Sequence, residues 1–192
     1  MHCFLQGERG SGKSFLLRQL LQPYEGRMAG FAVQRLIQDD GVTGFRVKNV
    51  RDGLPCTDVT DPGADKDTFI YRGERNDAVL LRMIREVEQD LQAQCCDLIL
   101  LDEIGGAELC EPEFTAVLRR ILNCGKPCVG VWKSASNLKS MIRYQGLPEQ
   151  YLILHGEFEQ ELKKLGTILS YTAKNKDQCS AYLRHLLDTV DQ

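Results

Sequence analysis

The sequence of 192 residues contains no apolar stretch long enough to cross a bilayer, no basic run and no low-complexity segment. The first absence argues against a membrane-spanning protein. The second, with a net charge of -3, gives no electrostatic reason to expect binding to nucleic acid or to an anionic membrane surface. The amino terminus also lacks the charged start and the cleavage region of a signal peptide. We therefore expect a cytoplasmic protein without nucleic-acid or membrane partners.

The cysteines lack the spacing of a metal site. None of the eight forms a Cys-x-x-Cys pair, and His2, His155 and His185 are not spaced with them as zinc ligands would be. Several cysteines fall in apolar runs, where a free thiol packs as a small hydrophobic group. These absences argue against structural zinc, and we interpret the cysteines as the reduced thiols of a cytosolic protein.

The sequence also lacks an internal repeat and an obvious linker. Its apolar fraction of 43% and charged fraction of 27% are ordinary for a globular protein. The length suits one domain with a sizeable core, and we expect a single domain over residues 1–192.

What the sequence does contain is a phosphate-binding pattern near its start. Residues 7–14 read Gly-Glu-Arg-Gly-Ser-Gly-Lys-Ser and match the pattern Gly-x-x-x-x-Gly-Lys-[Ser/Thr] at every position. The apolar run at 2–5 predicts a buried strand before this loop. Apolar residues at helical spacing predict a helix after it, which begins near Lys13 and stops at Pro23. Strand, loop and helix together are the context that this pattern requires.

Each residue type in the loop has a physical role. Glycine permits backbone angles that other residues resist, and it leaves no Cβ in the way of a phosphate. The helix that follows adds the partial positive charge of its amino end. We expect Lys13 to reach the β- and γ-phosphates as a catalytic group and the Ser14 hydroxyl to hold Mg²⁺. The residues expected to bind nucleotide in this loop are Gly7, Glu8, Arg9, Gly10, Ser11, Gly12, Lys13 and Ser14.

A second element supplies the acidic partner that the metal needs. The apolar run at 97–101 leads directly into Asp102-Glu103-Ile104-Gly105. An aspartate at the carboxyl end of a buried parallel strand lies on the ligand-binding edge of the sheet. We expect Asp102 to hold Mg²⁺ and Glu103 to activate a water molecule for attack on the γ-phosphate. Gly105 would let the chain turn sharply beside the nucleotide.

Strand and helix patterns alternate along the rest of the chain. They predict an α/β fold of the P-loop three-layer type, with a mostly parallel sheet, helices on both faces and an inserted β-hairpin. The predicted strands are 30–37, 44–50, 69–71, 97–101, 127–132, 151–154 and 167–171, and residues 54–68 are predicted as loop. The predicted helices are 74–94, 112–125, 138–144, 158–165 and a last helix with a capping pattern at Asn175 and Gln178.

A switch GTPase is an alternative, because Asp102 to Gly105 also matches Asp-x-x-Gly. That class selects guanine through Asn-Lys-x-Asp. Here Asn175-Lys176-Asp177 is one residue too short, and Asn175 is better explained as a helix cap. The GTPase alternative is therefore disfavoured.

With these two elements, the chain resembles the small P-loop nucleoside-triphosphatase family first known from thermophiles, which includes the cancer-related nucleoside-triphosphatase of animals. The resemblance lies in the phosphate loop, in Leu98 to Gly105, in Gly30-Phe31 and Gly44-Phe45, and in Asn175-Lys176-Asp177, which resembles a family Asn-Arg-Asp element. Thr43 stands where the family usually has arginine, and residues 147–166 match nothing in it. The resemblance implies slow, Mg²⁺-dependent hydrolysis of several nucleoside triphosphates with little base selectivity.

Three functions follow from these features. The leading hypothesis is hydrolysis of a nucleoside triphosphate to the diphosphate and phosphate, with Lys133 or Arg143 as a possible extra cation. The first alternative is a small-molecule or nucleotide kinase, in which residues 54–68 and 133–150 form an acceptor pocket and a lid. The second alternative is a nucleotide-sensing interaction module with negligible turnover.

Overall fold

A computed structural model describes residues 1–93 and 96–190. Within these residues the chain forms one nine-stranded sheet. Five strands make its parallel part, in the order β2, β7, β8, β1, β9. Their bounds are Met28–Gln38 for β2, Leu98–Ile104 for β7, Cys128–Trp132 for β8, His2–Gln6 for β1 and Gly166–Ser170 for β9. The carboxyl ends of these strands meet at one edge of the sheet.

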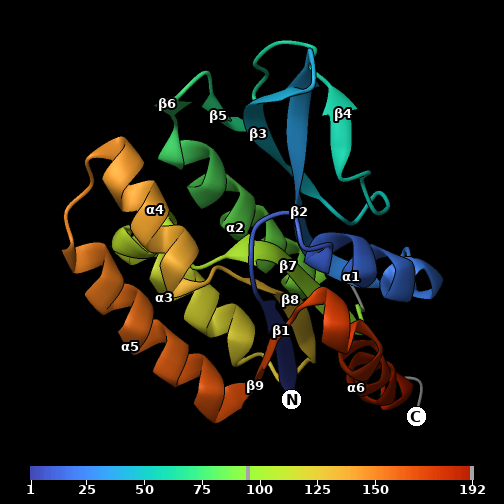
Figure 1. Cartoon of the computed structure of the whole chain (residues 1–192). Coiled ribbons are helices and arrows are strands. Elements are labelled where there is room, and N and C mark those ends of the chain that lie inside the picture. Colours follow the sequence, from blue (N-terminus) through green and yellow to red (C-terminus); the bar gives the residue numbers. More distant parts are fainter. Residues whose placement is uncertain (94–95, 191–192) are drawn as a thin grey trace.

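An extension continues the sheet beyond β2 and lies at the top of the view in Figure 1. Strand β3 (Gly41–Asn49) pairs antiparallel with β2, and β5 (Thr68–Tyr71) and β6 (Glu74–Arg75) follow outward. The short β4 (Asp58–Thr60) pairs with the other side of β2. The predicted hairpin turn is confirmed, with Asp39 and Asp40 in the left-handed region at φ 49° and 60°.

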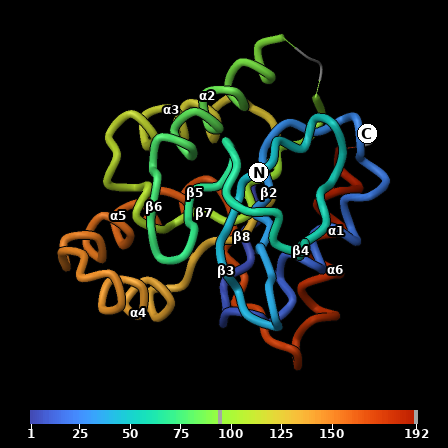
Figure 2. Tube along the Cα trace, turned by 90° about the horizontal axis from the view of Figure 1, so that it is seen from above, coloured from blue at the N-terminus to red at the C-terminus, as the bar shows by residue number. Residues whose placement is uncertain are grey.

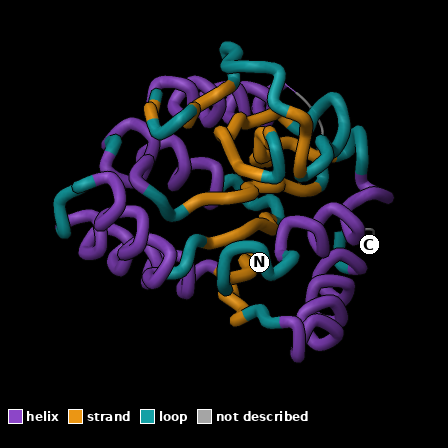
Figure 3. Tube along the Cα trace, turned by 45° about the horizontal axis from the view of Figure 1, so that its top comes forward, coloured by secondary structure: helices purple, strands orange, loops and turns teal. Residues whose placement is uncertain are grey.

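Helices cover both faces of the sheet, as Figures 2 and 3 show. On one face pack α2 (Asp77–Ala93), α3 (Pro112–Leu122) and α5 (Gln150–Leu165). On the other face pack α1 (Lys13–Leu21) and α6 (Lys176–Asp188). Strand β7 contributes Ile99 and Leu101 to the first core and Leu98 and Leu100 to the second, which explains its continuous apolar run. The predicted α/β three-layer fold with an inserted hairpin is thus confirmed.

The predicted strand at 151–154 is wrong, because these residues form the first turns of α5. Ile153 is 64% exposed, whereas the buried residues His155, Phe158 and Leu162 recur at helical spacing. A run of four apolar residues does not distinguish a strand from a helix. Here the helical spacing of the buried residues over the whole segment decides the secondary structure. The unmatched segment 147–166 is therefore mainly one helix, which follows α4 (Ala135–Gln145).

Asn175 is the N-cap residue of α6, as predicted, but its side chain makes no capping hydrogen bond there, so the predicted capping box with Gln178 does not form. Asn175 instead closes a box with Thr172 one turn earlier, where its Oδ1 accepts the Thr172 N–H at 2.7 Å. The remaining differences are smaller. Residues 74–75 form β6 instead of helix, residues 54–68 contain β4, and β7 continues through residue 104. The predicted helix end at Gln94 lies outside the described residues.

Candidate functional site

The phosphate loop joins β1 to α1 with backbone that only glycine suits. Gly10 and Gly12 have φ of 74° and 95°, and a Cβ on Gly7 would lie 2.3 Å from the carbonyl oxygen of Tyr171. The first N–H groups of α1 have no partner within the helix, so the loop and the helix start present donors to an anion. The predicted loop residues therefore come together in one turn.

Lys13 already occupies the inside of this loop. Its Nζ donates to the carbonyl oxygens of Gly7 at 3.0 Å and Glu8 at 2.6 Å, and to the Ser11 Oγ at 3.2 Å. Burial lowers the pKa of Lys13, while the carboxylates of Glu103 and Asp102 act in the opposite direction. A bound polyphosphate would give this half-desolvated ammonium an anionic partner.

Asp102 stands at the end of β7, with β8 between it and the phosphate-loop strand. Its side chain is buried, and its Oδ1 accepts from the Ser14 hydroxyl at 2.9 Å. Its Oδ2 accepts from Arg18 Nη1 at 3.2 Å. Burial raises the pKa of Asp102 to about 6, although the Arg18 guanidinium and the Ser14 hydroxyl both act to lower it. The fold thus joins two residues that lie 88 positions apart in the sequence.

The pair of Ser14 and Asp102 fits a magnesium site. A hydroxyl and a carboxylate are the hard oxygen ligands that Mg²⁺ prefers, and nucleotide sites hold this ion with one or two carboxylates plus substrate phosphates. In the part of the chain that the structure describes, no group of three or more His, Cys, Asp or Glu side chains is placed to hold a metal. Water and the substrate would supply the other ligands.

Arg18 is a site residue that the sequence analysis missed. Besides Asp102, it contacts two backbone carbonyls, donating from Nε to Pro55 at 2.7 Å and from Nη2 to Val33 at 3.0 Å. The sequence offered one signal for this role: Arg18 follows Ser14 by four residues, so the two side chains lie on the same face of the helix. Arg18 orients Asp102 and ties α1 to β2 and to the segment before β4.

Glu103 and Lys133 form an ion pair at the centre of the site. Lys133 follows β8, where its backbone N–H donates to the carbonyl oxygen of Ile104 at 2.8 Å. Of the two candidate extra cations, the structure places Lys133 in the site. Arg143 lies exposed on α4 and is not among the described residues that line the cavity.

The turn after β7 is built around two glycines and a buried carboxylate. Gly105 has φ 97°, and its N–H and that of Gly106 donate to Glu108 Oε1 at 2.8 and 2.6 Å. A Cβ on Gly106 would lie 3.2 Å from the Cε of Lys133, so glycine here leaves room for the lysine to reach Glu103. Arg75 Nη2 lies 3.8 Å from Glu108 Oε2.

Replacing Glu108 with alanine is expected to lower the free energy of unfolding by about 2 to 4 kcal/mol, because two buried N–H groups lose their acceptor. Glu108→Gln keeps a carbonyl oxygen in place and should lose about half as much. Urea unfolding of both variants measures this difference. Equal unfolding midpoints for the two variants would contradict the acceptor role of Oε1.

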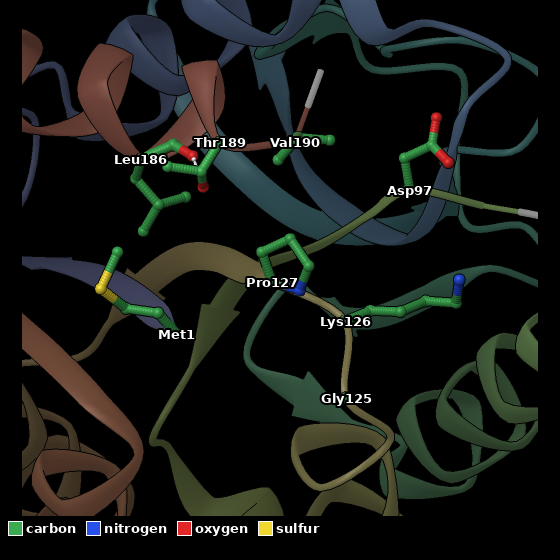
Figure 4. Close-up of a pocket in the computed structure, with 8 residues that line it drawn as sticks. All are labelled: Met1, Asp97, Gly125, Lys126, Pro127, Leu186, Thr189 and Val190. Carbon is green, nitrogen blue, oxygen red and sulfur yellow. Dashed lines mark hydrogen bonds between the residues drawn. The ribbon is translucent and has the colours of Figure 1, made fainter. Parts of the chain in front are cut away.

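A cavity of about 670 Å³, a size typical of a small-molecule site, is lined by Lys13, Ser14, Asp102, Glu103, Glu108 and Lys133. Arg18 and Gly105 support the site without lining the cavity. The cavity runs from the phosphate loop across the ends of β8 and β7 to the antiparallel extension, with α4 on its other side. Another cavity, of about 310 Å³, lies at the opposite edge of the sheet among Met1, Asp97, Lys126 and Pro127 (Figure 4). This second cavity is remote from the phosphate loop and takes no part in the site.

A glycine-rich loop between a parallel strand and a helix, with its serine bonded to an aspartate on the next strand but one of the sheet, defines a P-loop nucleotide-binding protein. Comparison with known proteins agrees. The family model described as NTPase matches residues 2–155. Since this is well over half of the 192 residues, the chain belongs to the NTPase family. The family expected from the motifs is therefore confirmed.

Two relatives are named nucleoside-triphosphatase THEP1. The protein of Thermotoga sp. (strain RQ2) is 26% identical over 141 residues, which cover 71% of this chain and 76% of that protein. The protein of Metallosphaera sedula is 25% identical over 150 residues, which cover 77% and 79%. The crystal structure of THEP1 from the hyperthermophile Aquifex aeolicus aligns with a TM-score of 0.51 and 22% identity, over 97% of this chain and 99% of that one. This last likeness concerns the fold.

No helix in residues 1–93 or 96–190 combines the length and the apolar character needed to span a membrane. The described cysteines are free thiols. Two of them, Cys3 and Cys128, lie in the core of the sheet, where burial raises the pKa of Cys3 to about 12.

Proposed function

We propose that the chain hydrolyses nucleoside triphosphates to the diphosphate and phosphate, with Mg²⁺ and with little selectivity for the base. The observation that carries this proposal is the convergence of four groups on one cavity. A lysine inside a phosphate loop, a serine bonded to a buried aspartate, and a glutamate directly after that aspartate all line it. Both named relatives are nucleoside-triphosphatases, which supports the same activity.

The residues divide the reaction between them. Glu103 would accept a proton from the attacking water as its oxygen bonds to the γ-phosphorus and the bond to the β–γ bridging oxygen breaks. Lys13 would leave the carbonyls of Gly7 and Glu8 for the β- and γ-phosphate oxygens and stabilise the charge that develops there. Ser14 and Asp102 would hold Mg²⁺, which supplies charge neutralisation at these phosphates. Lys133, which is paired with Glu103, would orient this base toward the terminal phosphate.

The proposed lack of base selectivity is supported by the use of Asn175. Its side-chain amide donates to the carbonyl oxygen of Ser170 at 2.7 Å, and its oxygen accepts from Thr172. These backbone bonds occupy the asparagine that a guanine-selective motif would need. The Asn175-Lys176-Asp177 element therefore serves the entry into α6.

We expect phosphate release from ATP, GTP, CTP and UTP, with kcat/KM values within about tenfold of one another, because an enzyme that does not hydrogen-bond one particular base discriminates weakly between bases. Chelation of Mg²⁺ should abolish release from all four. The test is a continuous phosphate assay on the full chain with matched magnesium and EDTA series. A preference for one base greater than about a hundredfold would contradict the proposed selectivity. Release from none of the four would contradict the hydrolase itself.

A further inference from the structure

The cavity of the site is larger than its phosphate-binding part. Beyond Glu103 it continues over the antiparallel extension, where apolar side chains line it together with Thr57 and Arg75. We call this part the hairpin compartment; its apolar walls are Val33, Phe45, Phe69, Ile70 and Leu80, from β2, β3, β5 and α2. The proposed hydrolysis uses none of these side chains.

The order of the strands places the hairpin compartment beyond the terminal phosphate. Along the sheet the sequence is β1, β8, β7, β2, β3, β5, and the phosphate loop follows β1. Lys133 follows β8 and Glu103 lies near the carboxyl end of β7, so both lie between the loop and the compartment. In a phosphate loop the lysine and the magnesium site are near the terminal phosphate. A molecule in the compartment would therefore approach the γ-phosphorus from the side of Glu103.

Arg9 links the loop to the compartment. It belongs to the phosphate loop, yet its guanidinium lies over the Phe45 ring, 5.4 Å from the ring centre. The opposite flank of the loop is closed, since the backbone of Tyr171 contacts Gly7. Within the described residues, no residue of β9 or of the segment that follows it lines the cavity. The space next to the phosphates thus opens toward the extension.

The walls and the rim of the compartment suit a small aromatic alcohol. The rings of Phe45 and Phe69 lie 6.3 Å apart, and Ile70 and Leu80 complete an apolar surface for a planar ring. At the rim, Arg35 binds Asp58 through two hydrogen bonds of 2.6 and 2.7 Å, both side chains being partly exposed. This pair offers donors and acceptors to the polar edge of such a ring.

We propose that the hairpin compartment binds a phosphoryl acceptor of nucleoside chemistry, with an aromatic base and a sugar hydroxyl. This inference rests on the proposed function, because the donor is the same bound triphosphate. The acceptor hydroxyl oxygen attacks the γ-phosphorus, and the bond to the β–γ bridging oxygen breaks. The hydroxyl proton passes to the Glu103 carboxylate, and the nucleoside diphosphate leaves with the bridging oxygen. Water takes the place of the hydroxyl when the compartment is empty.

The test is a mixture of the full chain and magnesium ATP with adenosine, guanosine, cytidine, uridine or thymidine, each in a separate sample. Phosphorus NMR of each sample quantifies free phosphate and nucleoside monophosphate together. We expect at least one nucleoside to be phosphorylated at least about tenfold faster than ATP is hydrolysed in its absence, because the compartment replaces water with a bound nucleophile. Free phosphate without any nucleoside monophosphate overturns this inference and leaves the hydrolase intact. No product of either kind rejects the proposed function.

Two variants of the compartment walls test whether the acceptor binds there. Ile70→Asn makes one wall polar, and Val33→Phe narrows the compartment without exposing apolar surface. Each is expected to lower the ratio of nucleoside monophosphate to free phosphate at least about tenfold, in line with the cost of altering a hydrophobic pocket. The matched control is Val42→Asn on β3, whose side chain is exposed outside the cavity. A ratio that stays at the wild-type value in both wall variants, with folding verified by circular dichroism, overturns the assignment to the compartment.

Discussion

Replacement of Glu103 by glutamine is expected to lower kcat for phosphate release about 100- to 10,000-fold, the range over which a general base acts. Nucleotide affinity should change little. Glutamine has nearly the same shape, and its carbonyl oxygen can still accept from Lys133, the partner of Glu103 in the structure. What the amide loses is the ability to take a proton from water. The variant should therefore lose activity through kcat, whereas its KM should stay within a few fold of the wild-type value.

Two measurements separate this outcome from a structural defect. Phosphate release gives kcat, and calorimetric titration with magnesium ATP gives the affinity of the slow variant. The matched control is Glu157→Gln, which removes the same charge from an exposed position on α5. We expect the control to match the wild type in both measurements. An undiminished kcat in Glu103→Gln would show that another group accepts the proton.

The parts of the site that could be predicted from the sequence are those whose chemistry is local. The glycines at 7, 10 and 12, Lys13 and Ser14 are set by how a backbone turn meets a phosphate, so the order of residue types is sufficient. Asp102 and Glu103 were also predictable, because a buried parallel strand must end at the ligand-binding edge. Their placement together in one cavity agrees with that expectation. Their roles in binding and catalysis stay predictions.

The parts that could not be predicted depend on contacts between distant segments. Arg18 meets Asp102 across 84 positions, and only the sheet order brings them together. Glu108 is one acidic residue among many in the sequence, and its role appears only where it accepts two glycine N–H groups. The helix over residues 150–165 was misread for a related reason. Its buried side is fixed by packing against partners such as Trp132, whose ring stacks on His155 at 4.7 Å.

Lys133 lies between these two cases. The sequence placed it after a buried strand at the ligand-binding edge of the sheet, where a lysine is more often a solvated surface charge than a site residue. The structure adds Gly106, whose missing Cβ gives the lysine its path to Glu103. Gly106 and Lys133 are 27 positions apart, and a single sequence does not indicate that they lie side by side in the site.

The second large effect is expected from Lys13→Ala, which should weaken both binding and turnover. Charge-assisted hydrogen bonds from an ammonium to phosphate are worth about 1.5 to 3 kcal/mol, so the affinity for magnesium ATP should fall about 10- to 150-fold. The same group stabilises the charge that develops as the β–γ bond breaks. The fall in kcat/KM should therefore exceed the fall in affinity by a further factor of about 100 or more.

The stability of the variant without nucleotide distinguishes this loss from unfolding. Lys13 is buried at a cost, since burial lowers its pKa, and its hydrogen bonds go to loop carbonyls instead of an anion. Removing it should thus change the melting temperature of the free protein by only a few degrees. The rise in melting temperature that magnesium ATP gives the wild type should become smaller, in line with the weaker affinity. Lys164→Ala, which removes an exposed positive charge at the end of α5, is the control and should keep the full rise. If Lys13→Ala kept that rise as well, the phosphate loop would bind its ligand without the ammonium group, and the catalytic role assigned to Lys13 would lose its basis.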